Sequence, residues 1–166
     1  MWAADVMTRD VLTLAPGMTV EQAAERLVQR GVSGAPVVDE RGRLIGILSE
    51  SDILRQLKRI AEETLGKRYL TSRVHSLDLL AFLGEREHAA VDAVYRQLRA
   101  SRVSDVMTAH VHGVAPTDSL ESVAAAMIEH DVNRLPVVDL DRVVGIITRA
   151  DLARVLATGR ADVPRL

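Results

Sequence analysis

The chain contains no cysteine and very few aromatic residues. Among its 166 residues there are one Trp, one Phe and two Tyr. Without cysteine the chain can form no disulfide, thiolate zinc site, iron–sulfur cluster or cysteine nucleophile. A chain of this length can bury a core of its own, so it needs no disulfide or metal site to fold. The absence of cysteine is compatible with a reducing compartment, and we expect a cytoplasmic protein.

The chain also lacks an excess of charge of one sign, and it has no long apolar runs. The chain has 21 basic and 23 acidic residues and a formal net charge of -2, with no basic stripe. Nucleic acid is therefore not an expected partner. No apolar run has the length of a membrane span, and the N-terminus lacks the layout of a signal peptide. We expect no membrane partner.

Catalytic motifs are missing as well. The chain has no nucleophile elbow, no phosphate loop and no dinucleotide fingerprint of spaced glycines. None of its acidic residues forms an identifiable pair of general acid and general base. The sequence therefore predicts no catalytic residue and no enzyme.

The chain does contain an internal repeat, since one unit of about fifty residues occurs twice. A shift of 100 residues places Ala4–Thr8 over Ser104–Thr108, and 14 of the 36 residues from 4 to 39 are identical to their counterparts. After Asp39 the match continues at a shift of 99, which places Asp52 over Asp151. Duplicated units of this kind normally share one architecture and pack together.

Each copy predicts the element order β-α-β-β-α. Thr19 and Gln22 have the spacing of a capping box, and Ser119 takes the capping place in the second copy. The helices they begin carry one apolar face each, formed by Val20, Ala23, Ala24, Leu27 and Val28, and by Leu120, Val123, Ala124, Met127 and Ile128.

Two short apolar runs, 36–38 and 44–48, follow the first helix on either side of a turn-prone segment and predict a strand pair. A second helix is expected to start near Ser49, with an apolar side formed by Ile53, Leu54, Leu57, Ile60 and Ala61.

We therefore divide the chain into a first repeat at 3–60, a helical linker at 61–102, a second repeat at 103–158 and a tail at 159–166. In the linker, two groups of apolar residues suggest two helices with Gly84 between them, namely Leu77, Leu79, Leu80 and Leu83, and then Ala90, Ala93, Val94 and Leu98. The linker could cover one edge of the repeats or mediate self-association.

The motifs Asp-Val-Met-Thr, Pro-Val-Val-Asp and Gly-Ile-Leu-Ser-x-x-Asp occur in this order in the first copy, and the second copy repeats them with Gly-Ile-Ile-Thr-x-x-Asp as the third. In this respect the chain resembles the cystathionine-β-synthase (CBS) domain, and the two copies resemble the paired Bateman module. The resemblance implies an α+β fold of two tandem repeats packed sheet to sheet with pseudo-two-fold symmetry. It also implies two clefts for AMP, ADP, ATP or another adenosyl ligand such as S-adenosylmethionine, a homodimer, and regulation of another protein whose identity is unknown.

The resemblance assigns roles to the start of the second helix in each repeat. Asp151 and Asp52 would hold the two ribose hydroxyls, and Thr148 and Ser49 would contact phosphate, where free backbone N–H groups favour an anion. The alternative is that each Ser/Thr-x-x-Asp only caps its helix, which needs no ligand.

The two copies differ before the Pro-Val-Val strand. The main cleft would use Val132, Asn133 and Arg134, and Arg134 would pair with phosphate. The second cleft would use Val32, Ser33 and Gly34, which supply no charge. Because Glu50 also replaces Arg149, we expect weaker binding in the second cleft. The alternative for Arg134 is a solvated surface side chain.

In the family the base pocket is apolar and is formed partly by the segment after Val-Met-Thr of the opposite repeat, here Val11–Pro16 and Val111–Pro116. His110-x-His112 could present two rings to a metal, but no nearby carboxylate completes a site and we predict none. The competing function is a ligand-free interaction module that scaffolds a partner through its dimer and linker-helix surfaces. A catalytic domain regulated by the repeats would have no room in this chain.

Overall fold

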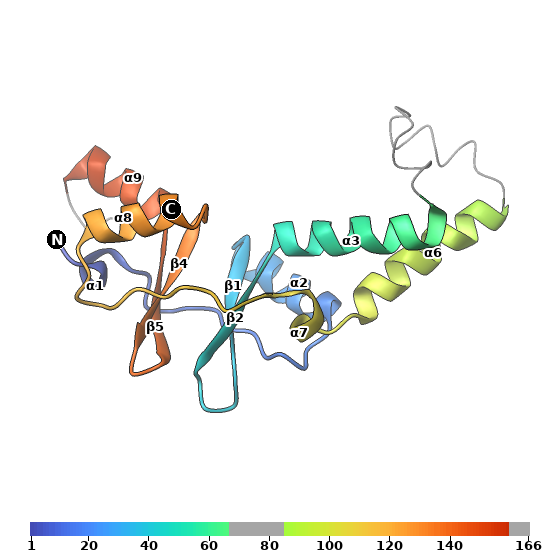
Figure 1. Cartoon of the computed structure of the whole chain (residues 1–166), viewed down its shortest axis with the longest axis horizontal. Coiled ribbons are helices and arrows are strands. Elements are labelled where there is room, and N and C mark those ends of the chain that lie inside the picture. The colour runs from blue at the N-terminus through green and yellow to red at the C-terminus, as the bar shows by residue number, and fades with distance from the viewer. Residues whose placement is uncertain (67–84, 160–166) are drawn as a thin grey trace. The chain divides into compact units, whose positions relative to one another are not determined.

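A computed structural model of the chain describes residues 1–66 and 85–159. Helices and short antiparallel strands alternate, which confirms the predicted α+β class (Figure 1). The first repeat contains α1 (Ala3–Val6), α2 (Val20–Arg30), β1 (Gly34–Val38), β2 (Leu44–Ser49) and α3 (Glu50–Leu65). After the linker helix α6 (Glu85–Ala100) come α7 (Val103–Val106), β3 (Thr108–Ala109), α8 (Leu120–Glu129), β4 (Arg134–Asp139), β5 (Arg142–Thr148) and α9 (Arg149–Thr158).

The predicted start of α2 is confirmed. The Gln22 N–H donates to the Thr19 hydroxyl over 3.2 Å, and the Thr19 N–H donates to the Gln22 side chain over 3.1 Å. The helix ends at Gly31, whose φ of 62° lies in the left-handed region that favours glycine. In the second copy Ser119 caps α8 by accepting from the Ser122 N–H. These local signals fix both helix starts.

The buried faces of these helices are narrower than predicted. Val20, Ala23 and Leu27 are buried in α2, but Val28 is 80% exposed. Its equivalent in α8, Ile128, is 79% exposed, and Leu54 of α3 is 63% exposed. At about 100° per residue, Val28 falls at the edge of the apolar stripe centred on the three buried residues. The expectation that Val28, Ile128 and Leu54 lie on buried faces was therefore wrong.

The strand pairs follow the predicted pattern. Strands β1 and β2 belong to a three-stranded sheet in the order β1-β2-β3, and β4 and β5 form a two-stranded sheet. The β4–β5 pair is antiparallel and places Arg134 opposite Thr148. The register shifts between Val137 and Val138, whose partners are Gly145 and Val143, so Val144 is an extra residue that marks a bulge in β5. The first strand predicted for repeat 1 is reduced to isolated bridges at Thr8 and Leu14.

The described residues form two compact units that do not coincide with the repeats. The first unit comprises 1–15, 35–47 and 109–166. Its core contains residues of α1 together with β4, β5 and α8, namely Ala3, Val6, Val114, Val123, Met127, Leu135, Val137 and Ile147. The leading helix of the first repeat thus packs among elements of the second.

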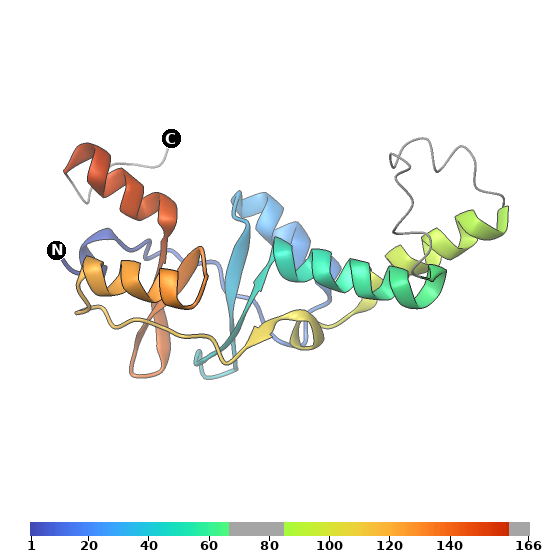
Figure 2. The same cartoon turned by 45° about the horizontal axis from the view of Figure 1, so that its top comes forward.

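The second unit comprises 16–34 and 48–108, and in it a helix of the second repeat, α7, packs among helices of the first. Its core contains Val20, Ile60, Ala61, Val94 and Leu98, and Val106 of α7 packs against it. The Val103 N–H donates to the Met18 carbonyl oxygen over 2.9 Å. Helices α3 and α6 lie side by side in both views (Figures 1 and 2).

The second predicted linker helix is therefore confirmed as α6, with Val94 and Leu98 buried. The expected first linker helix and Gly84 lie outside the described residues. Within the described part of the chain, no helix combines the length and apolar character that a bilayer crossing requires.

Candidate functional site

The start of α9 brings Thr148 and Asp151 into direct contact. The Thr148 N–H and hydroxyl both donate to Oδ2 of Asp151, over 2.8 and 2.7 Å. The Asp151 N–H donates back to the Thr148 hydroxyl over 3.3 Å. The Asp151 side chain is almost fully buried, with 2% exposure. The capping box that the spacing predicts is therefore formed here.

The start of α3 repeats this arrangement with Ser49 and Asp52. The Ser49 N–H and hydroxyl donate to Oδ2 of Asp52 over 2.8 and 2.5 Å. The Thr108 hydroxyl donates to the other oxygen, Oδ1, over 2.8 Å. Thr108 ends the Val-Met-Thr motif of the second repeat, so the motif of one copy contacts the carboxylate of the other. Asp52 is 4% exposed.

An arginine three residues after each aspartate completes both sites. Arg154 donates to Oδ1 of Asp151 over 2.9 Å, and Arg55 pairs with Oδ1 of Asp52. Charged partners of this kind compensate the cost of burying a carboxylate. Sequence reasoning missed Arg55, Arg154 and Thr108, although the Asp-x-x-Arg spacing is present in both copies.

The strand β4 brings the residues predicted for the main cleft to the start of α9. Arg134 lies opposite Thr148 in the strand register, and its side chain is partly buried. The Arg149 N–H donates to the Asn133 carbonyl oxygen over 3.0 Å, and its guanidinium donates to the Val132 carbonyl oxygen over 3.2 Å. Three groups that could bind an anion thus lie around one strand end, and they belong to Arg134, Thr148 and Arg149.

The first copy has the same backbone arrangement with different charges. The Glu50 N–H donates to the Ser33 carbonyl oxygen over 3.0 Å, as Arg149 does to Asn133. Val32 follows the end of α2, and Gly34 begins β1 as a buried residue. At this strand end the equivalents of Arg134 and Arg149 are a glycine and a glutamate, so the expected difference in charge is present at matching positions.

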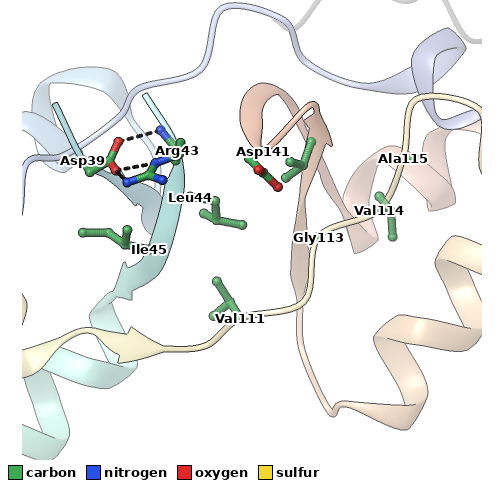
Figure 3. A pocket seen from close by; sticks show the side chains of 10 residues that line it. Asp39, Arg43, Leu44, Ile45, Val111, Gly113, Val114, Ala115 and Asp141 are labelled. Atoms are coloured by element: carbon green, nitrogen blue, oxygen red, sulfur yellow. Dashed lines mark hydrogen bonds and ion pairs between the residues drawn. The ribbon is translucent and has the colours of Figure 1, made fainter. Parts of the chain in front are cut away.

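A pocket of about 490 Å³ lies in the first unit between the two hairpins (Figure 3). Its apolar walls come from both hairpins and from the segment after β3, and include Leu44, Ile45, Val111, Val114 and Val138. Arg43 turns to Asp39 at the rim and pairs with it over 2.7 Å (Figure 3). The backbone N–H of Arg43 and its guanidinium lower the pKa of the Asp39 carboxyl. None of the ten residues predicted to contact a ligand lines this pocket, but four residues of Val111–Pro116 do.

Close backbone packing shapes the pocket wall. A Cβ on Gly113 would lie 2.7 Å from a methyl of Val138, so the segment approaches β4 more closely than any other residue type would allow. The Val114 N–H donates to the Pro136 carbonyl oxygen over 3.0 Å, which holds the segment beside the strand. The Leu14 N–H makes the matching bond to the Pro36 carbonyl oxygen over 2.9 Å, but Thr13 replaces Gly113 in the first copy, so only the close approach at the glycine is specific to the second repeat.

The histidines do not form the pair that the sequence offered. His112 stacks on His130 with ring centroids 3.8 Å apart, and His110 has a positive φ of 54°. Among residues 1–66 and 85–159 there is no group of three or more His, Cys, Asp or Glu placed to hold a metal ion.

Comparison with known proteins places these features in a family. A model of the CBS domain matches residues 3–59 and 103–158. The chain is 32% identical over 146 residues to the CBS domain-containing protein CBSX1 of Arabidopsis thaliana, a chloroplastic protein. This alignment covers 87% of the chain and 58% of CBSX1, so the chain spans less than two thirds of that relative.

Two solved structures share the fold. CBSX2 of Arabidopsis thaliana in complex with AMP superposes with a TM-score of 0.65, at 24% identity, over 94% of the chain and 96% of CBSX2. The CBS domain pair of MJ0100, in complex with 5′-methylthioadenosine and S-adenosyl-L-methionine, gives 0.66 at 20% identity, over 96% and 98%. With two segments that match the family and the same paired architecture, the chain belongs to the CBS domain family as a tandem pair of repeats.

Proposed function

We propose that the chain is a regulatory module that binds an adenosine nucleotide or a related adenosyl ligand and signals its occupancy to a partner protein. The buried carboxylate beside a hydroxyl at the start of α9, and again at α3, carries the proposal. A carboxylate accepts from both vicinal hydroxyls of a ribose at once, which suits Asp151 and Asp52. AMP and adenosyl ligands in the related CBS pairs support the same ligand class.

The residues best suited to bind the phosphate of the ligand lie in the second repeat. Thr148 caps the start of α9, where the helix dipole favours an anion, and Arg134 and Arg149 add two guanidinium groups near that strand end. The proposed main cleft comprises Asp151, Thr148, Arg134, Val132 and Asn133, and Arg149 lies beside it. The weaker cleft comprises Asp52, Ser49, Val32, Ser33 and Gly34, where Glu50 opposes an anion.

The base would rest on aliphatic walls, because the chain has almost no aromatic side chains to stack on it. The segments Val11–Pro16 and Val111–Pro116 are the candidates for such a surface, and Val111 and Val114 of the second segment line an apolar pocket in the first unit. Ligand sites of this kind are mostly apolar with a few polar groups that fix orientation. ADP, ATP and S-adenosylmethionine share the adenosine that this arrangement recognises.

We propose no catalytic activity for the chain, because a regulatory role fits its two CBS repeats, which the family model matches at 3–59 and 103–158. A homodimer in the cytoplasm is the expected state. The competing function is a ligand-free module that scaffolds a partner through exposed helix faces. The exposed Val28 and Ile128 favour it, as do the existing partners of both aspartates.

Thermal unfolding with AMP, ADP, ATP, S-adenosylmethionine and NAD separates the two functions. A ligand that binds only the native state raises the midpoint, by an amount that grows with its concentration. We expect the adenosyl ligands to raise the midpoint, and an Asp52→Asn, Asp151→Asn double variant to lose that response. Asp92→Asn, an exposed change on α6, is the matched control. No rise with any of the five ligands would instead support the scaffold.

A further inference from the structure

The two buried aspartates have almost no accepting capacity left for a ribose. A carboxylate offers about four acceptor positions. At Asp52 all four are taken, by the N–H and hydroxyl of Ser49, by Arg55 and by the Thr108 hydroxyl. At Asp151, Thr148 fills two positions on Oδ2 and Arg154 holds Oδ1. A diol can therefore bind only if a present donor leaves.

The donors differ in how easily they can leave. The Thr148 and Ser49 contacts cap a helix, and the groups involved belong to a rigid turn. The arginines lie at the surface, with side chains 31% exposed for Arg154 and 67% for Arg55. A released guanidinium is hydrated at once, whereas a released cap leaves backbone N–H groups unsatisfied.

We propose that Arg154 and Arg55 act as internal stand-ins for a ribose hydroxyl. Each guanidinium holds Oδ1 of its aspartate and must swing away when an adenosine ligand binds. This inference rests on the proposed function. It makes each arginine a positioning residue that lowers affinity and ties binding to a movement at the surface of α3 or α9.

The spacing in both copies supports this role over an incidental surface pair. Asp52-x-x-Arg55 and Asp151-x-x-Arg154 occupy matching positions at the repeat shift of 99. Both arginines contact Oδ1, the oxygen that does not cap the helix. In both copies the arginine can therefore leave its oxygen without uncapping the helix.

The test is a calorimetric titration of the whole chain with AMP and with 2′,3′-dideoxy-AMP, which lacks the diol. Arg154→Met should bind AMP about threefold to tenfold more tightly than the unchanged chain, the value of a half-exposed charged hydrogen bond. Its affinity for dideoxy-AMP should not rise. Arg55→Met is the matched variant in the first copy, and Arg26→Met, exposed on α2, controls for loss of a surface cation.

Equal or weaker AMP binding by Arg154→Met would overturn the inference while leaving the proposed function in place. A parallel gain for AMP and dideoxy-AMP would overturn it as well, since the diol would then play no part. AMP binding that appears only in the arginine variants would support the stand-in role and show that the unchanged chain is blocked. If no variant binds AMP, the inference falls together with the proposed function. Thermal unfolding without ligand confirms that each variant is folded.

Discussion

At the scale of single residues, the copies differ most at the strand end that would meet phosphate. Arg134 lies opposite Thr148, whereas the first copy has Gly34 at the matching position. The frame of the two sites is the same, since each has an aspartate, a hydroxyl and an arginine three residues on. We therefore expect the difference in charge to affect ligand binding rather than the fold.

Replacing Arg134 should weaken phosphate recognition selectively. Arg134→Met should bind AMP about tenfold more weakly, because a hydrogen bond between charged groups is lost. Adenosine, which has no phosphate, should bind as before. Calorimetric titration measures both ligands, and Arg142→Met, exposed at the other end of the β4–β5 pair, is the control. An equal loss for AMP and adenosine would mean that Arg134 supports the fold only.

At the scale of elements, the repeated motifs are explained by close packing between the copies. A Cβ on Gly145 would lie 2.3 Å from the Met7 sulfur and 2.8 Å from its Cγ. The Thr8 N–H donates to the Ile146 carbonyl oxygen over 2.9 Å directly beside this contact. The Met of one motif and the Gly of another thus fit each other inside the first unit.

Gly145→Ala should therefore destabilise the protein by about 1–3 kcal/mol, the usual cost of overpacking a buried site. A second change, Met7→Ala, should restore part of that loss by making room. Gly17→Ala is the control, since a Cβ there meets nothing within 4 Å. Urea unfolding gives the free energies, and an effect of Gly145→Ala no larger than that of Gly17→Ala would contradict the packing.

The β1–β2 turn should show a dependence on pH. Hydrogen bonds from the Arg43 backbone and side chain lower the pKa of Asp39 below its ordinary value of 3.8. A lowered folded-state pKa adds stability that is complete above the unfolded value and is lost as the pH falls through the folded value. The stability difference between the unchanged chain and Asp39→Asn should therefore be constant at neutral pH and shrink below about pH 4. A difference that stays constant down to about pH 2 in urea unfolding would contradict this.

Sequence patterns predicted most of these elements, because their signals are local. The Thr19 capping box, the Gly31 stop and the apolar strand runs each act within a few residues. The repeat itself placed Asp52 and Asp151 at equivalent helix starts. The exposure of Val28 and the contacts of Arg55 and Thr108 depend on which segments meet, and Thr108 lies 56 residues from its partner. Periodicity within one helix carries no information on such partners.

At the scale of the whole molecule, the repeats and the compact units divide the chain differently. The leading helix of each repeat, α1 or α7, packs into the unit that holds the helices of the other repeat. Neither repeat keeps all of its own core. A chain cut between the repeats would therefore leave apolar surface uncovered on both pieces.

We expect a homodimer, and exposed apolar side chains at matching positions of the two copies are candidates for its interface. Val28 and Ile128 are equivalent at the repeat shift of 100 and are 80% and 79% exposed. We expect light scattering to give twice the 18.1 kDa of one chain. A Val28→Glu, Ile128→Glu double variant should be monomeric, because charge at an apolar interface is costly. Leu140→Glu, at an exposed turn, is the control. An unchanged mass in the double variant would assign the dimer to another surface.

A titration of two matched variants decides whether two unequal copies of one site bind an adenosine ligand. AMP is titrated calorimetrically into the unchanged chain, Asp151→Asn and Asp52→Asn. We expect Asp151→Asn to remove the tighter binding event and leave the weaker one, and Asp52→Asn to do the reverse. Equal loss of affinity in the two variants, or AMP binding unchanged in both, would contradict it.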